Sequence, residues 1–443
     1  MKRKIKYILF FIFVFIGMSF FTTSIDGDVL WNYGFGYAIR MGEIPYKDFN
    51  MIITPFYPFL MSLFLLFSKN IIFFYLANSL LITLIFYLLE KILKGNTYLF
   101  YILLVFPLPI MLQSSYNILL VLFIILLIYL EKKDYNDYLI GIIVGLTILT
   151  KQSVGVFLII PTLIYYYKKP LKIIKRFISI IIICGVFLLY LLFTNSFNSF
   201  MDLCFFGLLD FSNKNGFHIS FSFCIGILLL LVTIVLTIRN KKDIKYFYIL
   251  MFSSIMIPLF DFNHVTYYLF VFSIILMDRN MNSLYLKKYS IIFMIVFAFI
   301  FFLFNIELKS IEYPNHYNNF NYRLMFNSNG ENIIRDKVIN YINKNKDKNI
   351  IIISSDAYFY QITMNRKIDY YSLNNYGNHG YNGTSKMYDR IDKLSKGTII
   401  IINMVEINNR SNSLQFNWEV AEYASKCGKL IKKIDCFGIY EIV

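Results

Sequence analysis

Charged residues are scarce in this chain of 443 residues, where Asp, Glu, Lys and Arg together make up 16% of the sequence. An average soluble domain has roughly 25% charged residues. Hydrophobic residues account for 58% and aromatic residues for 19%. This composition excludes a disordered chain, a collagen-like chain and a single water-soluble globule. We therefore predict an α-helical polytopic membrane protein.

Cysteine is also scarce. The five cysteines form no Cys-x-x-Cys motif and no Cys/His spacing typical of a metal site. Their low number also excludes a disulfide scaffold. Cys427 and Cys436 flank a predicted strand, and both a disulfide and two free thiols are compatible with that position.

The charge that is present is distributed unevenly. From Asn305 onward the chain has 18 basic and 14 acidic residues, which leaves 25 basic and 13 acidic residues before it. We therefore predict a transmembrane body over residues 1–305 and a small C-terminal α/β domain over residues 306–443, long enough to bury its own core. Its apolar runs predict strands and helices in alternation: strands at 349–354, 368–372 and 398–403, helices near 355, 385–395 and 417–426, and a hairpin at 429–442.

Apolar runs long enough to span a bilayer recur along the body. The first follows the basic segment Met1–Lys6, and because no Ala-x-Ala-like cleavage site follows, we interpret it as an uncleaved span and not as a signal peptide. The other runs bring the total to about eleven spans: 71–89, 97–112, 115–130, 138–150, 154–167, 177–195, 218–238, 246–260, 266–277 and 286–304.

The short run 55–68, which contains two prolines, decides the predicted orientation. Lys and Arg are enriched on cytoplasmic loops. If this run lies along the outer interface, about 20 of the 25 basic residues of the body are cytoplasmic, together with the N-terminus. If it crosses, the later loops change sides and the rule is violated repeatedly. We therefore expect a multi-pass protein of the cell membrane with one outer loop at 24–70, ending in a juxtamembrane helix, and an extracytoplasmic C-terminal domain.

The net charge of +16 follows from this topology. No basic patch interleaved with aromatic residues indicates nucleic acid as a partner. The ionisable residues of the body gather at the outer ends of the predicted spans, whereas an ion-coupled transporter would place one near the midplane. This pattern favours a site at the outer membrane face. Lys151, which lies between two apolar runs with almost no loop around it, is the residue that ordinary loop polarity explains least.

The outer loop at 24–70 carries the most specific motif. Asp26 and Asp28 follow the first span, and aromatic and small residues at helical spacing after them predict an amphipathic interfacial helix. Gly42 and the Pro45-Tyr46 turn are expected to end that helix. The segment reads Gly42-x-x-Pro45-Tyr46-x-Asp48, and Pro55 leads into the next apolar run.

These residues resemble the first loop of the polyprenyl-phosphate-sugar-dependent glycosyltransferases of the GT-C type, the superfamily of the protein O-mannosyltransferases and aminoarabinose transferases. Thr150-Lys151-Gln152 and Asp261-Phe-Asn-His264 resemble two shorter motifs of the same superfamily. The overall plan of a large first outer loop, many spans and an outer α/β tail extends the resemblance to the whole chain.

The resemblance implies inverting transfer of a sugar from a polyprenyl-phosphate donor in the lipid bilayer to a hydroxyl of a glycan, lipid or protein acceptor. Such a reaction needs a carboxylate that accepts the proton of the hydroxyl. Asp28 matches the catalytic acid of the family. Many members have Glu after this Asp, whereas Val29 follows here and a second acid precedes, so Asp26 is the alternative base. Asp26 could instead be a turn residue, as the Asp-Gly pair suggests.

The departing phosphate needs cationic or hydrogen-bonding groups. Lys151, Arg40 and His264 are the candidates, with His218 as a second histidine. Each also has a structural interpretation, because Lys151 could be an interfacial anchor, Arg40 could face solvent, and a histidine near a span end is often bonded locally. The motifs add three supporting residues: Tyr46, Asp48, which could fix the turn, and Asp261.

These residues lie at outer span ends in the predicted topology. We therefore expect Asp28, Lys151 and His264 to face one cavity that opens sideways to lipid, with aromatic residues of the loop helix as its wall: Trp31, Tyr33 and Tyr37. No cofactor is required, because a monophosphate leaving group does not demand a metal. Paired acids suit Mg²⁺ or Mn²⁺, however, so a divalent cation held by Asp26 and Asp28 is an alternative.

Two other functions fit the same topology. A polysaccharide polymerase would join repeat units at the outer face. A non-enzymatic lipid-sugar flippase or exporter would share the basic inner loops, but it gives no reason for the Asp and Pro-Tyr-x-Asp motif, and it would need cationic residues along a path through the bilayer.

Overall fold

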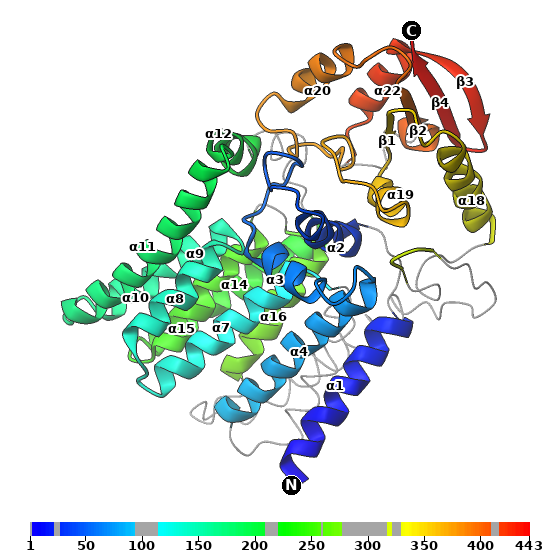
Figure 1. Cartoon of the computed structure of the whole chain (residues 1–443). Coiled ribbons are helices and arrows are strands. Elements are labelled where there is room, and N and C mark those ends of the chain that lie inside the picture. Colours follow the sequence, from blue (N-terminus) through cyan, green and yellow to red (C-terminus); the bar gives the residue numbers. More distant parts are fainter. Residues whose placement is uncertain are drawn as a thin grey trace.

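The computed structural model describes residues 2–21, 27–93, 114–208, 220–257, 260–276, 317–320, 329–408 and 416–443. Figure 1 shows a bundle of helices with a smaller α/β tail against one of its ends, and the N-terminus lies at the opposite end. The described part of the chain thus contains an apolar helical body and a tail with a mixed sheet.

The described helices of the body follow the apolar runs of the sequence. In chain order they are α1 (Lys2–Phe21), α2 (Gly27–Arg40), α3 (Phe56–Phe64), α4 (Ile71–Leu93), α7 (Tyr116–Lys132), α8 (Asp137–Ile148), α9 (Gln152–Phe157), α10 (Ile159–Tyr165), α11 (Pro170–Phe193), α12 (Phe197–Met201), the π-helical turn η1 (Asp202–Phe206), α14 (Phe221–Arg239), α15 (Ile244–Phe252), the 3-10 turn η2 (Ser253–Met256) and α16 (Phe262–Leu276).

Three of the described helices, α4, α11 and α14, are long and apolar enough to cross a membrane by length and composition. Five further apolar segments are shorter. The predicted run at 154–167 is broken at Leu158 into α9 and α10, and the run at 246–260 changes from α15 into η2. The runs at 97–112 and 286–304 lie outside the described residues. The count of about eleven spans therefore stays a prediction.

The ambiguous run at 55–68 forms α3, a helix of nine residues. At 1.5 Å per residue such a helix is about 14 Å long, whereas the hydrocarbon core of a bilayer is roughly 30 Å thick. The backbone N–H of Phe56 donates to the carbonyl of Leu149 at 2.8 Å, which fixes the start of α3 against the end of α8. Its length thus argues against a crossing at this position.

A buried ion network joins several helices at the end of the bundle away from the tail. The Arg176 guanidinium, of which only 1% is exposed, lies 2.6 Å from Glu131 and 2.8 Å from Asp137. The hydroxyl of Tyr248 donates to the same Glu131 carboxylate at 2.9 Å. A buried charge is tolerated only when it is paired and hydrogen-bonded, so this network fixes the ends of α7, α8, α11 and α15 relative to one another.

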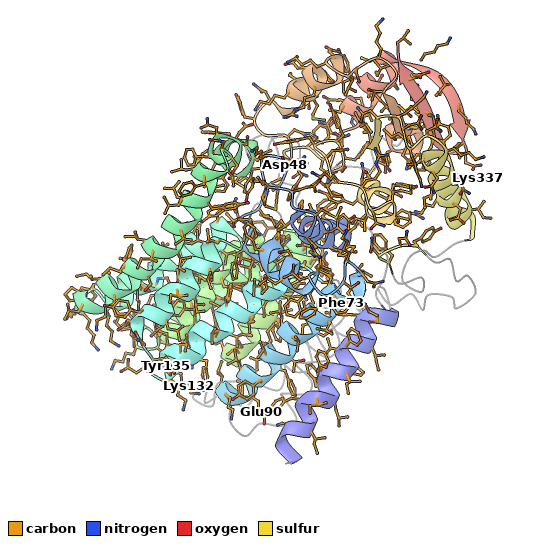
Figure 2. All side chains as sticks on the ribbon, viewed as in Figure 1. Asp48, Phe73, Glu90, Lys132, Tyr135 and Lys337 are labelled. Carbon is orange, nitrogen blue, oxygen red and sulfur yellow. The ribbon has the colours of Figure 1, made fainter. Side chains whose placement is uncertain are left out.

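Lys132, in one of the basic connections of the body, lies at this end (Figure 2). Figure 2 shows Glu90, Lys132 and Tyr135 at the end of the bundle remote from the tail, whereas Asp48 lies close to the tail. The Lys132 ammonium donates to the carbonyl of Ile92 at 2.7 Å. Lys132 and Asp48 thus lie at opposite ends of the bundle (Figure 2), and the orientation of the chain in the membrane stays a prediction.

The tail contains a four-stranded sheet with the order β1-β2-β4-β3, in which β1 and β2 are parallel and the other pairs antiparallel. Alternate isoleucines of β1 and β2 enter two different core clusters, which is why both strands read as continuous apolar runs. The elements are α18 (Asn329–Lys344), β1 (Ile350–Ile353), α19 (Ala357–Thr363), α20 (Gly383–Asp392), β2 (Ile399–Asn403), α21 (Met404–Asn408), α22 (Trp418–Cys427), β3 (Gly428–Ile434) and β4 (Phe437–Ile442).

The predicted strand at 368–372 is wrong. The half-buried carboxylate of Asp369 accepts hydrogen bonds from the backbone N–H groups of Tyr371 and Ser372, each at 2.9 Å, and from the Ser372 hydroxyl at 2.8 Å. Such local bonds compete with strand pairing and form a turn. Cys427 and Cys436 are both free thiols in the structure.

The topology predicts which exposed positions an impermeant thiol reagent reaches in intact cells. Lys47→Cys in the first outer loop and Lys396→Cys in the tail should be labelled above the wild-type background. Lys133→Cys, which lies at the basic end of the bundle, should be labelled only after lysis. The three lysines are exposed, so each substitution leaves the core unchanged. The reverse labelling pattern would place the proposed site on the cytoplasmic side.

Candidate functional site

The first outer loop lies between the body and the tail. Helix α2 packs against α3 of the body and against α19 of the tail (Figure 1). The approach to α19 is so close that a Cβ at Gly34 would lie 2.3 Å from the ring of Tyr358. Only glycine fits this crossing, so the position of α2 is fixed from both sides.

The aromatic residues of α2 do not all have the predicted role. Tyr33 and Tyr37 are fully buried. The Tyr33 hydroxyl donates to the carbonyls of Lys69 and, at 3.2 Å, Asn319, and the Tyr37 hydroxyl lies 3.5 Å from the carbonyl of Arg366. Both therefore support the contact between loop and tail and do not form the wall of an open cavity. The helix is buried on most sides because the tail covers the face that was expected to be interfacial.

The motif residues after α2 form a compact turn. Gly42 adopts a φ of +86° and Tyr46 a φ of +67°. The carboxylate of Asp48 accepts the backbone N–H of Ile44 at 2.7 Å, and the buried hydroxyl of Tyr46 donates to the carbonyl of Ile53 at 2.8 Å. In the structure Asp48 and Tyr46 thus hold the loop in shape. A role of these two residues in substrate binding stays a prediction.

Arg40 ends α2 and is directed toward α3. Its Nε donates to the carbonyl of Leu65 at 3.1 Å, which is the C-cap residue of α3. A cation at the C-terminal end of a helix interacts favourably with the unpaired carbonyls and the helix dipole. The structure therefore gives Arg40 a role in joining α2 to α3.

Asp28 is exposed and lies in the first turn of α2. One turn later, the Asn32 side chain donates to the carbonyl of Asp28 at 2.6 Å and accepts the backbone N–H of Tyr116 at 3.3 Å. Asn32 therefore links the start of α2 to the start of α7. The ring of Tyr116 in turn lies 6.0 Å from the ammonium of Lys151, at cation–π distance.

Lys151 is buried, with 7% of the residue exposed, at the junction of α8 and α9. Its ammonium donates to the carbonyl of Ile255 at 2.9 Å and interacts electrostatically with both Asp261 and Asp28. A lysine that anchors a span end extends its ammonium into water, whereas this one is buried and bonded to a backbone carbonyl. The arrangement disfavours the anchor interpretation.

Asp261 and His264 form a hydrogen-bonded pair at the start of α16. One carboxylate oxygen of Asp261 accepts the backbone N–H of His264 and the other lies 2.8 Å from its Nδ1. A carboxylate on Nδ1 fixes the orientation of an imidazole and directs Nε2 away from the carboxylate. The structure thus brings together Asp28, Lys151, Asp261 and His264, which come from α2, the α8–α9 junction and the start of α16.

Three residues of this cluster were not singled out from the sequence: Asn32, Tyr116 and Tyr267. The hydroxyl of Tyr267 lies 3.4 Å from that of Ser115 and interacts electrostatically with Asp28 and Asp261. Two of them could have been found from helical spacing, which places residues three or four apart on the same face of a helix. Asn32 follows Asp28 by four residues, and Tyr267 follows His264 by three.

Asp26 and His218 lie outside the described residues, so the predicted pair of acids is represented by Asp28 alone. Among the described residues, no group of three or more His, Cys, Asp or Glu side chains is arranged to hold a metal ion. The two described carboxylates of the cluster, Asp28 and Asp261, both interact with the Lys151 ammonium. A divalent cation placed between them would have to compete with this lysine.

The loop also joins the tail through buried polar groups. The carboxylate of Glu43, which is 4% exposed, accepts the backbone N–H of Ile368 at 3.2 Å. Burial raises the pKa of Glu43 to about 8. The Asn50 amide donates to the carbonyl of Asn378 at 2.8 Å and lies 3.3 Å from Nδ1 of His379. These contacts fix the tail against the loop that carries Asp28.

No protein-family model matches this chain, and no curated protein matches it in sequence. Among solved structures, an oligosaccharyltransferase from Archaeoglobus fulgidus, in a complex with zinc and sulfate, is similar to it with a TM-score of 0.43 and 10% identity. The likeness covers 98% of this chain and 73% of that one. A likeness at this level assigns neither a fold family nor an activity.

The buried Glu43 makes stability depend on pH. Its pKa is about 8 in the native state and 4.5 for an exposed Glu, so between these values the native state binds more protons than the unfolded state and loses stability as the pH rises. Glu43→Gln should therefore raise the unfolding temperature by a few degrees at pH 9 and by little at pH 5. Asp389→Asn, on the exposed side of α20, is the control and should change neither value. An equal effect of Glu43→Gln at both pH values would contradict the assignment.

Proposed function

We propose that the chain is a membrane glycosyltransferase that moves a sugar from a polyprenyl-phosphate donor to an acceptor hydroxyl at the outer membrane face. The observation that carries the proposal is the position of Lys151, which is buried at the tail-facing end of the bundle, donates to the carbonyl of Ile255 at 2.9 Å and interacts electrostatically with Asp28 and Asp261. A fixed cation beside a carboxylate is what this transfer needs, because one group must offset phosphate charge while the other accepts a proton.

Asp28 is the proposed general base. The acceptor oxygen attacks the anomeric carbon of the donor and its proton passes to the Asp28 carboxylate, while the bond between the anomeric carbon and the phosphate oxygen breaks. The electron pair of that bond leaves with the polyprenyl phosphate. Attack opposite the leaving group inverts the anomeric centre. Asp28 is exposed at the start of α2, so an acceptor can approach it from outside the bundle.

Lys151 and His264 are the proposed partners of the departing phosphate. A lysine ammonium has three N–H donors, and the carbonyl of Ile255 takes one of them. Asp261 orients the His264 ring through Nδ1, so that Nε2 is the atom proposed to face the phosphate. With these two groups in place we propose a reaction that requires no metal.

The site also fits a donor that cannot leave the bilayer. Its charged groups lie at the ends of apolar helices, where the phosphate of a lipid-linked sugar would be held while the polyprenyl chain stays among the hydrocarbon tails. We propose that the site opens sideways to lipid for this reason.

Replacing the proposed base tests the function directly. Asp28→Asn keeps the size and exposure of the side chain but removes the proton acceptor, so product formation should fall by about a hundredfold or more. Mass spectrometry of surface glycans in a deletion strain that carries each variant measures the product. Asp389→Asn is the matched control and should restore the glycan fully. Normal product from Asp28→Asn would exclude Asp28 as the base, and an inactive Asp26→Asn would then move that role to Asp26.

A second experiment tests whether Lys151 or a divalent cation offsets the charge of the departing phosphate. Lys151→Met keeps the length of the buried side chain but removes its charge, and it should lower the transfer rate in membranes by about a hundredfold. Lys133→Met, at the basic end of the bundle, should leave the rate unchanged. Chelation with EDTA should also leave the wild-type rate unchanged. Loss of activity with EDTA, restored by Mg²⁺ or Mn²⁺, would show that a divalent cation takes part.

A further inference from the structure

The tail contains a cavity that the proposed reaction does not use. Its volume is about 380 Å³, within the range of roughly 300–1,000 Å³ that is typical of small-molecule sites. It lies where α20 and α22 begin, next to the loop that precedes α20. Its lining residues are Tyr376, Gly377, His379, Asn382, Gly383, Thr384, Ser385, Tyr388, Asn417 and Glu419.

The chemistry of this lining is specific. Two tyrosine rings are combined with amide and hydroxyl groups and with one carboxylate, that of Glu419, which accepts the Tyr376 hydroxyl, and no Lys or Arg is among the lining residues. Burial lowers the pKa of His379 to about 3, so its imidazole adds no positive charge. A phosphate or another anion would find no cation here, whereas a neutral polar molecule with an apolar face finds both kinds of partner it needs.

Several contacts hold the lining in place. The Asn417 amide donates to the Thr384 hydroxyl at 2.9 Å, and the Tyr376 hydroxyl donates to Glu419 at 3.3 Å. The ring of Tyr388 stacks on Tyr423 with 4.1 Å between the centroids. A cavity whose side chains are already fixed loses little conformational entropy when a ligand binds.

The cavity is also connected to the loop that carries Asp28. His379 lies at hydrogen-bond distance from two asparagines, with Nε2 3.1 Å from Asn374 of the tail and Nδ1 3.3 Å from Asn50 of the first outer loop. A ligand in the cavity would thus be held by a part of the tail that is fixed relative to α2.

We propose that this cavity binds a neutral sugar unit of the acceptor. The tyrosine rings would stack on the C–H face of the sugar while the amides and hydroxyls bond to its hydroxyl groups. That the bound sugar belongs to the acceptor rests on the proposed function. In that case the tail selects the glycan to be extended.

Binding can be measured without transfer. Saturation-transfer NMR on the full chain in lipid nanodiscs, with cellobiose, maltose and N,N′-diacetylchitobiose as neutral probes, should show binding of at least one of them, and glucose 1-phosphate should not bind. Ser385 is exposed and lines the cavity, so Ser385→Trp should block it and weaken binding at least tenfold. Tyr388→Leu should weaken binding similarly, and Lys396→Trp, in the exposed turn after α20, should leave it unchanged.

The outcomes separate this inference from the proposed function. If no neutral probe binds, or if binding survives Ser385→Trp and Tyr388→Leu, the sugar cavity is wrong, whatever Asp28→Asn does to the surface glycan. If Ser385→Trp abolishes binding while Asp28→Asn and Asp26→Asn both leave the glycan normal, the cavity binds sugar and the proposed transfer is wrong. Both proposals hold only if Ser385→Trp lowers probe binding and glycan yield, and Asp28→Asn lowers glycan yield but not probe binding.

Discussion

The buried ammonium of Lys151 is the constraint on which the candidate site depends. Removing a charge from water is costly unless opposite charges and hydrogen bonds offset the loss. Here the carbonyl of Ile255 accepts one N–H and the carboxylates of Asp28 and Asp261 supply opposite charge. These partners come from η2, α2 and the residue before α16, so the lysine interacts with three separate elements of the chain.

A second constraint fixes the position of Asp28. Helix α2 cannot shift toward the tail, because Gly34 already contacts Tyr358, and its first turn is tied to α7 through Asn32. Polar groups of the following turn are satisfied by the tail, most clearly Glu43 and Asn50. The tail therefore acts on the loop as a structural support. The same contacts would place a glycan held by the tail at a fixed distance from the base.

Much of this arrangement follows from local sequence patterns, and some does not. Charge distribution predicts the separation of body and tail, and the Pro45-Tyr46 turn and the isoleucine strands follow from residue type. The burial of Tyr33 and Tyr37 could not be predicted, because a helix with aromatic residues looks interfacial until the tail that covers it is known. The backbone partners of Arg40 and Asp48, the carbonyl of Leu65 and the N–H of Ile44, are groups that no motif identifies, and a role of either side chain in substrate binding stays a prediction. That Asp28, Lys151 and His264 face one cavity was expected from topology and stays a prediction.

The most direct test is a structure by cryo-electron microscopy of the full chain in nanodiscs that contain a long-chain polyprenyl phosphate. The account predicts density for the phosphate within hydrogen-bond distance of the Lys151 ammonium, near Nε2 of His264, with the carboxylate of Asp28 on the side open to the acceptor. The account would be contradicted if the phosphate were bound elsewhere. It would also be contradicted if Asp28 and Lys151 lay more than about 20 Å apart, which is well beyond the roughly 10 Å over which charges interact in salt solution.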